Sequence, residues 1–294
     1  MSKYNAQVDT QALVALVREA GEAILEVYHN RLQWEVEVKE DDSPLTAADL
    51  EANRVLLKGL PEIADLPIIS EESPLPELSV RRQWARYWLI DPLDGTKEFI
   101  QRNGQFTVNV ALIEQGVPIV GAVQVPVTDV TYLGLNPIKG EKIALKYQPG
   151  AAPEVLKVRP LQQAYDQRED FTAVVSHRHG TDTLGALMQH IKSRWSGQLE
   201  SRSAGSSLKF CLVAEGSADL YPRLAPTSEW DTAAAQAILE AAGGAVVEAE
   251  ALAKKQWAPL RYNTKESVLN PWFYALGDKN FNWLGFLSDN AENA

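Results

Sequence analysis

The stretch Asp91-Pro-Leu-Asp-Gly-Thr96 follows an apolar run, residues 87–90, and decides how the chain folds around it. The apolar run is typical of a short buried strand. Proline and the Asp-Gly pair then enforce a turn. Because proline stiffens this turn, Asp91, the Leu93 carbonyl and Asp94 can lie on one side of it as oxygen ligands, a set that suits a hard cation.

Carboxylates recur where other elements begin or end, at Asp49, at the pair Glu71-Glu72 and at Asp231. Each has an ordinary explanation as a helix cap, a solvated loop or a turn. If they converge without a cation, mutual repulsion raises their pKa values, whereas two magnesium ions would make the cluster favourable. The spacing does not match a calcium-binding EF-hand loop.

The first half of the chain reads as α+β. Asp9 and Thr10 can cap a helix that continues through Tyr28, because apolar residues recur there at helical spacing. Thr46 and Asp49 stand as a capping pair before a second helix, which we expect to end at Gly59 and Pro61. The expected strands are residues 34–38, 87–90, 106–113 and 118–127, the last two forming a hairpin.

The second half is expected to begin after a proline-rich, charged segment at about residues 136–170, which is the best candidate for a domain junction. We therefore predict an N-terminal α+β subdomain, residues 1–158, and a C-terminal α/β subdomain, residues 159–294. Strands are predicted at 171–176 and 218–224, and helices at 183–191, 206–215 and 231–242. The pair Gly243-Gly244 would close the last helix.

Composition limits the class of protein. At 294 residues the chain suits one large domain or two closely packed ones, and its net charge of −11 argues against binding to nucleic acid polymers. A single cysteine, Cys211, indicates a reducing compartment and a small core residue, and with four histidines it supplies a zinc site poorly.

The chain ends suggest a cytoplasmic protein. No signal peptide and no apolar run of about 18 residues are present, so we expect the cytoplasm. The apolar segment 281–287 could touch the inner face of a membrane, but its length favours packing back on the body.

Three ordered strings resemble the signatures of the inositol monophosphatase superfamily of lithium-sensitive, magnesium-dependent phosphatases. They are Ser70-Glu-Glu72, Asp91-Pro-Leu-Asp-Gly-Thr96, and Trp230-Asp-Thr-Ala-Ala234 followed by Gly243-Gly244. The resemblance runs from Lys39 to about Ala275. It implies a layered α-β-α-β-α sandwich, of the type shared with fructose-1,6-bisphosphatase, with the metal site between two subdomains.

Three further strings resemble the CysQ branch of this superfamily, the 3′(2′),5′-bisphosphate nucleotidases. They are Lys39-Glu-Asp-Asp-Ser-Pro-Leu-Thr-Ala-Ala-Asp49, Asp94-Gly-Thr-Lys-Glu-Phe99 and Arg102-Asn-Gly-Gln-Phe-Thr-Val-Asn109. Inositol phosphatases usually carry Thr-Asn-Phe where Lys97-Glu98-Phe99 stands. The resemblance implies hydrolysis of the 3′-phosphate of adenosine 3′,5′-bisphosphate (PAP) to AMP, and of its sulfated relative PAPS, in sulfur assimilation or nucleotide recycling.

Two other functions stay open at this point. An inositol or other sugar-phosphate monophosphatase would use the same metal motifs, because these motifs determine the reaction and leave the alcohol undetermined. A non-catalytic nucleotide or anion sensor on the same fold is disfavoured, since every matched position keeps its expected residue type. The partner in every case is a small molecule, and the protein is expected to be a monomer or a homodimer.

The resemblance also implies roles for individual residues. Two or three magnesium ions would be held by Glu71, Asp91, the Leu93 carbonyl, Asp94 and Asp231, with Glu71 preferred over Glu72. Asp49 and Thr96 would form a pair that orients and deprotonates the attacking water, with Asp41 in the same network. The substrate would be bound by Gly95, Thr96, His177, Ser206, Lys209, Arg223 and Asp231.

Among these substrate-binding residues, Arg223 or Lys209 would hold a 5′-phosphate through charge-assisted hydrogen bonds. His177 would contact adenine or ribose. The ordinary alternatives are that the two cations lie on the surface and that the histidine lies in a solvated loop.

Overall fold

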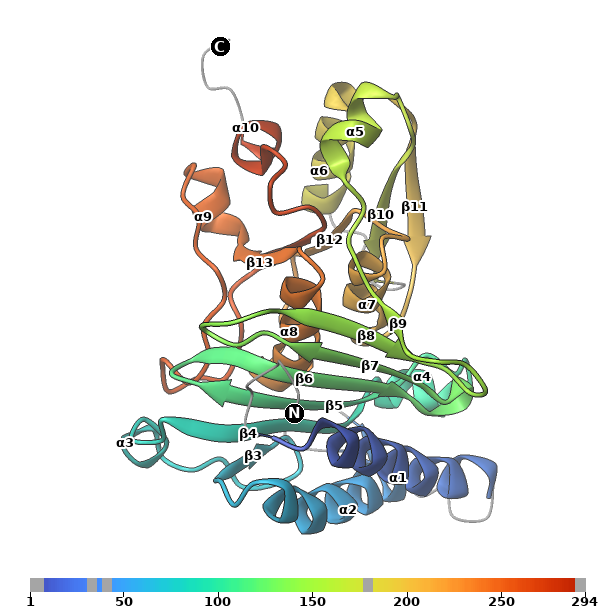
Figure 1. Ribbon diagram of the computed structural model, residues 1–294, viewed down its shortest axis with the longest axis vertical. Helices are drawn as coiled ribbons and strands as arrows, with labels where there is room; N and C mark the ends of the chain where they lie inside the picture. Colours follow the sequence, from blue (N-terminus) through green and yellow to red (C-terminus); the bar gives the residue numbers. More distant parts are fainter. Residues whose placement is uncertain (1–7, 31–35, 39–43, 177–181, 289–294) are drawn as a thin grey trace.

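The computed structural model describes residues 8–30, 36–38, 44–176 and 182–288, and it contains two large β-sheets separated and covered by helices (Figure 1). The larger sheet has seven strands in the order β3-β4-β5-β6-β7-β8-β9, and every pair except β3 with β4 is antiparallel. Its strands are β3 (Ile68–Ser70), β4 (Arg86–Asp94), β5 (Thr107–Glu114), β6 (Val117–Val125), β7 (Val130–Leu135), β8 (Ile143–Tyr147) and β9 (Glu154–Val155).

Two long helices, α1 (Thr10–His29) and α2 (Ala47–Ile63), cover one face of this sheet (Figure 1). The Asp9 side chain caps α1 by accepting hydrogen bonds from two backbone N–H groups, as predicted. Side chains alternate along β4: Trp88 contributes to the core beneath these helices, and Tyr87 to the core on the opposite face. Because both faces are buried, the strand reads as a continuous apolar run.

The end of α2 differs from the prediction, because the helix continues through Gly59 and Pro61 to Ile63. Pro61 lies in the last turn, where its missing N–H removes only one helical hydrogen bond. A Cβ on Gly59 would lie 2.3 Å from a Cδ atom of Leu16. Glycine thus permits close packing of α2 on α1, and this packing maintains the helix beyond the residue that would end it in isolation.

The second sheet has five strands in the order β11-β10-β12-β14-β13. Strand β10 is parallel to both of its neighbours, and β14 is antiparallel to β12 and β13. The strands are β10 (Phe171–Val175), β11 (Leu199–Ser203), β12 (Leu220–Arg223), β13 (Ala245–Glu248) and β14 (Phe273–Leu276).

Helices between and outside the sheets complete five layers, so the α-β-α-β-α sandwich is confirmed (Figure 1). The middle layer contains α7 (Leu208–Ala214) and α8 (Ala233–Ala241), and both sheets contribute to the core around them. The outer layer contains α5 (Leu161–Asp166), α6 (Asp182–Arg194), α9 (Ala249–Ala253) and α10 (Trp283–Leu287). The smaller elements are β1 (Val36–Val38), β2 (Pro44–Thr46), α3 (Leu78–Arg81), α4 (Thr96–Ile100), η2 (Pro126–Thr128) and η3 (Glu229–Asp231).

The C-terminal apolar segment packs back on the body, as predicted from its length. Phe281, Trp283 and Phe286 are buried in the core of the outer layer, and the Trp283 indole donates a hydrogen bond to the Asp278 carbonyl at 2.7 Å. Cys211 is a buried core residue of α7, also as predicted. None of the helices in the described ranges has the length and apolar character needed to cross a membrane.

The segment predicted as a junction carries more structure than expected. Strands β8 and β9 lie within residues 136–170 and extend the larger sheet. Most of β8 is half-buried, β9 is exposed, and both strands contain charged residues. Their hydrophobic pattern is therefore weak, which is common for strands near a sheet edge. The larger sheet ends at Val155 and the second begins at Phe171. A subdomain division at residues 158 and 159 stays a prediction.

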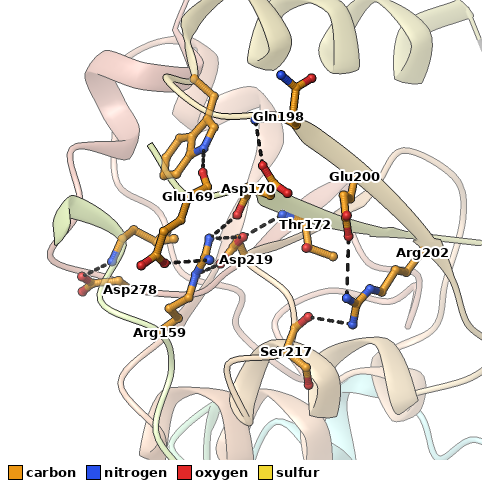
Figure 2. A network of polar contacts seen from close by, with 12 residues as sticks. Arg159, Glu169, Asp170, Thr172, Gln198, Glu200, Arg202, Ser217, Asp219 and Asp278 are labelled. Atoms are coloured by element: carbon orange, nitrogen blue, oxygen red, sulfur yellow. Dashed lines mark hydrogen bonds and ion pairs between the residues drawn. The ribbon is translucent and has the colours of Figure 1, made fainter. Parts of the chain in front are cut away.

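Arg159 links the connecting segment to the second sheet (Figure 2). Its guanidinium donates to both carboxylate oxygens of Asp219 at 3.0 and 2.8 Å, and to the Asp170 carbonyl at 2.7 Å. The backbone N–H of Thr172 donates to the same carboxylate at 2.7 Å. Burial raises the pKa of Asp219, while the Thr172 N–H and the arginine oppose this shift. The paired charges therefore hold the chain where it enters the second sheet.

Replacing Arg159 with alanine (Arg159→Ala) is expected to lower the free energy of unfolding by about 3 kcal/mol, because Asp219 would stay buried without its cation. Urea denaturation measures this change. The matched control is Arg202→Ala, since the Arg202 and Glu200 side chains of the same network are about half exposed. That control is expected to change the free energy of unfolding by less than about 0.5 kcal/mol. Equal losses of stability in the two variants would contradict the stabilising role of the Arg159–Asp219 pair.

Candidate active site

A β-bulge in β4 arranges the first carboxylates of the site. Asp91 pairs with Asn109 on β5, and Asp94 pairs with Thr107, so β4 contains one extra residue between these two pairs. In a regular strand, residues three apart point to opposite faces, and one extra residue returns the second to the face of the first. Here the strand that we expected to end at residue 90 continues to Asp94, and the predicted turn is this bulge.

Three carboxylates converge beside the bulge. Glu71, Asp91 and Asp231 each offer an oxygen atom, and these atoms lie within 4.8 Å of one another. Glu71 directly follows β3, and its backbone N–H donates to the Ile90 carbonyl at 3.2 Å, which fixes its place next to β4. Among the described residues this group includes Glu71 but not Glu72.

Asp231 reaches the group from the end of η3. Its carboxylate accepts a hydrogen bond from the Ser228 N–H at 2.9 Å, so it also caps this short helix. The buried Glu229 anchors the same turn, because both of its carboxylate oxygens accept from the Asn263 N–H at 3.0 and 2.9 Å. Burial raises the pKa of Glu229 to about 7.

The electrostatics of the cluster favour a bound cation. Burial raises the pKa of Asp91 well above its usual range, and the charges of Glu71, Asp94, Asp231 and Asp49 raise it further. The pKa of Asp231 is raised by burial and then by the charges of Asp94 and Glu71. A hard divalent cation would offset this repulsion, and a donor set made only of oxygen atoms fits magnesium.

Asp49 and Thr96 lie together, as their proposed pairing requires. The Thr96 hydroxyl donates to Asp49 Oδ1 at 3.2 Å and lies 3.5 Å from the Leu93 carbonyl oxygen. Asp49 Oδ2 accepts from the N–H and hydroxyl of Thr46 at 2.8 and 2.6 Å, in the capping box of α2. Asp49 therefore both caps α2 and contacts Thr96. Asp41 lies outside the described residues.

Gly95 and Ser206 lock the loop after the bulge. Gly95 has a φ of +92°, and a Cβ at this position would lie 2.2 Å from Ser206 Oγ. The Ser206 hydroxyl lies 2.8 Å from both the Asp94 and the Gln105 carbonyl oxygens. Only glycine therefore fits where the two segments meet, and the hydroxyl that we expected to bind substrate contacts backbone carbonyls in this structure.

A cavity of about 230 Å³ opens beside the acidic cluster, and Asp94, Asp231, Lys209 and Arg223 all line it. The Lys209 side chain is buried; its ammonium group donates to the Ser206 carbonyl at 2.6 Å and lies 5.2 Å from the centre of the Tyr221 ring. Burial lowers the pKa of Lys209 to about 8, although the charge of Asp94 partly opposes the shift. The cavity thus combines acidic and basic groups.

Arg223 ends β12 and is oriented by neutral groups. Its guanidinium donates to the Ser176 hydroxyl at 3.0 Å and to the carbonyls of Ala225 and Pro226 at 3.2 and 2.8 Å. These contacts use three of its five N–H groups, so within the described residues two donors stay available. His177, which was expected to contact adenine or ribose, lies outside the described residues.

Sequence reasoning missed two buried residues next to the acidic cluster, Asn109 and Ser207. The Asn109 amide donates to Ser207 Oγ at 3.0 Å, and Ser207 Oγ lies 3.1 Å from Asp94 Oδ2. A polar residue between Val108 and Val110 in an apolar strand was a usable signal for Asn109, because buried amides need partners. Ser207 carried no such signal.

Comparison with known proteins identifies the family. The inositol monophosphatase family matches residues 5–273 of the chain. This chain belongs to the inositol monophosphatase family. The predicted superfamily is therefore confirmed, and an acidic site for a metal ion agrees with the metal dependence of its members.

Several members of the inositol monophosphatase family resemble most of the chain. The 3′(2′),5′-bisphosphate nucleotidase CysQ of Salmonella typhimurium is 47% identical over 259 residues, which cover 88% of this chain and 95% of the relative. The protein of the same name from Haemophilus influenzae is 31% identical over 99% of this chain and all of its own length. The crystal structure of CysQ from Bacteroides thetaiotaomicron has a TM-score of 0.73 and 40% identity, covering 92% of this chain and 98% of its own.

Proposed function

We propose that this protein is a magnesium-dependent 3′(2′),5′-bisphosphate nucleotidase that converts PAP to AMP and inorganic phosphate, and acts on PAPS at the same position. Relatives of this name cover nearly the whole chain at 31–47% identity. The structural observation that supports it best is the cavity that joins an acidic cluster to Lys209 and Arg223. A substrate with two phosphates needs the acidic cluster for the phosphate that reacts and the two cations for the distant one.

Glu71, Asp91, the Leu93 carbonyl, Asp94 and Asp231 would hold two or three magnesium ions. Phosphate monoesters hydrolyse extremely slowly in water, so the reaction requires large stabilisation of its transition state. When bound, magnesium lowers the pKa of the attacking water, shields the charge of the ester and stabilises the leaving alkoxide. No histidine or cysteine nucleophile is then needed.

The proton of the attacking water would pass toward Asp49 through Thr96. Because the Thr96 hydroxyl donates to Asp49 Oδ1, its oxygen lone pairs face away from that carboxylate and can accept a hydrogen bond from water. Asp49 Oδ2 is held by Thr46, so the carboxylate cannot rotate freely. This arrangement gives the pair the geometry of a general base, with Asp41 as an expected further member.

The basic side of the cavity would bind the phosphate that does not react. Among the described residues, Arg223 keeps two N–H groups without a partner, and Lys209 lines the same cavity. A guanidinium and an ammonium group together suit a phosphate dianion. Inositol monophosphates have no second phosphate for these cations, which favours the nucleotide over the sugar ester. Gly95, Thr96, Ser206, Asp231 and His177 stay proposed members of the substrate site.

Replacing Arg223 with alanine (Arg223→Ala) is expected to raise KM for PAP by about 10- to 100-fold, because a charge-assisted hydrogen bond contributes about 1.5–3 kcal/mol. The kcat is expected to change little, since the lost contact is to the distant phosphate. Steady-state kinetics with PAP, which carries a 5′-phosphate, and with adenosine 3′-monophosphate, which lacks it, show whether the rise in KM depends on that phosphate. An equal rise in KM for both substrates would count against contact with the 5′-phosphate.

The deciding experiment measures magnesium-dependent phosphate release from PAP, inositol 1-phosphate and AMP under identical conditions. Strong preference for PAP with AMP as the product supports the proposal. Preference for inositol 1-phosphate would keep the mechanism but replace the substrate. Absence of release from all three would favour a nucleotide or anion sensor.

We also propose that the protein works in the cytoplasm as a monomer or homodimer, on the basis of its single cysteine and its size. The peripheral membrane contact considered for the C-terminal segment gains no support, because the aromatic residues that suggested it are buried.

A further inference from the structure

A chain of hydrogen bonds runs behind the acidic cluster. The Thr107 hydroxyl donates to Asn109 Oδ1 at 2.9 Å, and Asn109 Nδ2 donates to Ser207 Oγ at 3.0 Å. The Ser207 hydroxyl lies 2.8 Å from the Asp231 carbonyl oxygen and 3.1 Å from Asp94 Oδ2. Asn109 Nδ2 also lies 3.4 Å from Asp94 Oδ2. Four polar residues are thus linked from Thr107 to Asp94, and the Asp231 carbonyl and the Asp94 carboxylate share the single proton of the Ser207 hydroxyl.

Burial makes this chain rigid. Thr107, Asn109 and Ser207 are at most 1% exposed, so water does not compete for their hydrogen bonds. Because Thr107 donates to the amide oxygen, the amide nitrogen of Asn109 must face Ser207 and Asp94. Every member has a partner, which is the condition under which a buried polar network stabilises one arrangement.

The chain joins segments that come from different layers of the fold. Thr107 and Asn109 belong to β5 of the larger sheet, Ser207 precedes α7 of the middle layer, and Asp231 ends η3. Asp94 and Asp231 are proposed metal ligands that lie far apart in the sequence. Ser207 contacts both, one through its carboxylate and the other through its backbone carbonyl.

We infer that Ser207, supported by Asn109 and Thr107, is a positioning residue for the metal site. The Ser207 hydroxyl contacts Oδ2 of Asp94, which leaves Oδ1 of that carboxylate for a cation. Its contact with the Asp231 carbonyl also keeps the η3 turn at a fixed distance from the β-bulge. Hydrogen bonds of this kind orient ligands before the cation binds. The inference rests on the proposed magnesium-dependent function, and neither the acidic motifs nor the family assignment includes Ser207.

The test is magnesium binding without substrate, measured by isothermal titration calorimetry on the purified full chain. Ser207→Ala is expected to raise the dissociation constant for magnesium about tenfold or more. Steady-state assays with PAP should show the same rise in the magnesium concentration for half-maximal rate. Ser207→Thr keeps the hydroxyl and is expected to restore magnesium affinity to within about threefold of the unaltered protein.

Two further variants separate positioning from general stability. Ser217→Ala removes a hydroxyl just beyond the other end of α7, where it donates to Glu215 at 2.8 Å, and magnesium affinity should not change. Thr107→Val removes the outer member of the chain without emptying its space, and a smaller loss of magnesium affinity than in Ser207→Ala is expected. Thermal unfolding without magnesium establishes that each variant is folded.

The outcomes distinguish the two proposals. Unchanged magnesium affinity in folded Ser207→Ala, with the unaltered protein binding normally, would overturn the positioning role and leave the proposed function intact. Equal losses of magnesium affinity in Ser207→Ala and Ser217→Ala would also overturn it, because the loss would then not depend on the contact between Ser207 and Asp94. If the unaltered protein itself fails to bind magnesium, the proposed function fails and the inference fails with it.

Discussion

Replacing Asp94 with asparagine (Asp94→Asn) is expected to reduce magnesium-dependent turnover of PAP about a thousandfold. This change corresponds to a loss of about 4 kcal/mol of transition-state stabilisation, within the range that a metal ion supplies. Asparagine preserves the shape of the side chain and its contact with Ser207 Oγ, so the loss follows from the missing charge. The measurement is kcat/KM at saturating magnesium.

The stability of the metal-free protein provides a second measurement on Asp94→Asn. The charge of Asp94 contributes to the raised pKa values of both Asp91 and Asp231, so its removal relieves repulsion. Without magnesium the variant should therefore unfold at the same or a higher temperature, and added magnesium should stabilise it less than the unaltered protein. Asp65→Asn, in an exposed loop, is the matched control and should change neither property. Full activity in Asp94→Asn would disprove the proposal that Asp94 is a magnesium ligand.

Replacing Thr96 with valine (Thr96→Val) is expected to lower kcat by about 10²- to 10⁴-fold, the usual contribution of general acid–base catalysis. Valine has nearly the same shape but lacks the hydroxyl that donates to Asp49 Oδ1. Asp49 keeps its two contacts with Thr46, so its position should not change. Magnesium affinity should stay within about threefold, because Thr96 is not one of the proposed metal ligands, and KM for PAP should change much less than kcat.

Thr96→Ser is the matched control, since serine keeps the hydroxyl and removes only a methyl group. It should retain most of the activity, which single-turnover kinetics can compare directly with Thr96→Val. A large loss of magnesium affinity in Thr96→Val would instead assign this residue to the metal site. An unchanged kcat would remove the Asp49–Thr96 pair from the proposed mechanism.

Local physical chemistry determined several elements that the sequence predicted correctly. The caps of α1 and α2 depend on Asp9, Thr46 and Asp49, and each acts on backbone N–H groups within three residues of itself. The hairpin of β5 and β6 depends on two apolar strands joined by a short polar turn. These interactions involve neighbours in the chain, so a pattern of residue types is enough to reveal them.

The elements that sequence reasoning missed depend on distant partners. Strand β11 reads Leu-Glu-Ser-Arg-Ser and is largely exposed, so no hydrophobic pattern marks it; it becomes a strand by pairing with β10. The end of α2 depends on Leu16 of another helix. In both cases the deciding interaction is a tertiary contact that offsets a weak or contrary local preference.

The sequence by itself indicated which carboxylates to propose as metal ligands, because carboxylates beside stiff turns and caps have a recognisable local form. It also indicated the family and the layered fold through ordered motifs. Only the tertiary structure decided how Glu71, Asp91 and Asp231 meet within 4.8 Å, that one extra residue in β4 brings Asp94 to the same face, and that Asn109 and Ser207 stand behind it. The reason is that each of these contacts joins residues from different strands or layers, and residue types along one segment do not specify the distance between two segments.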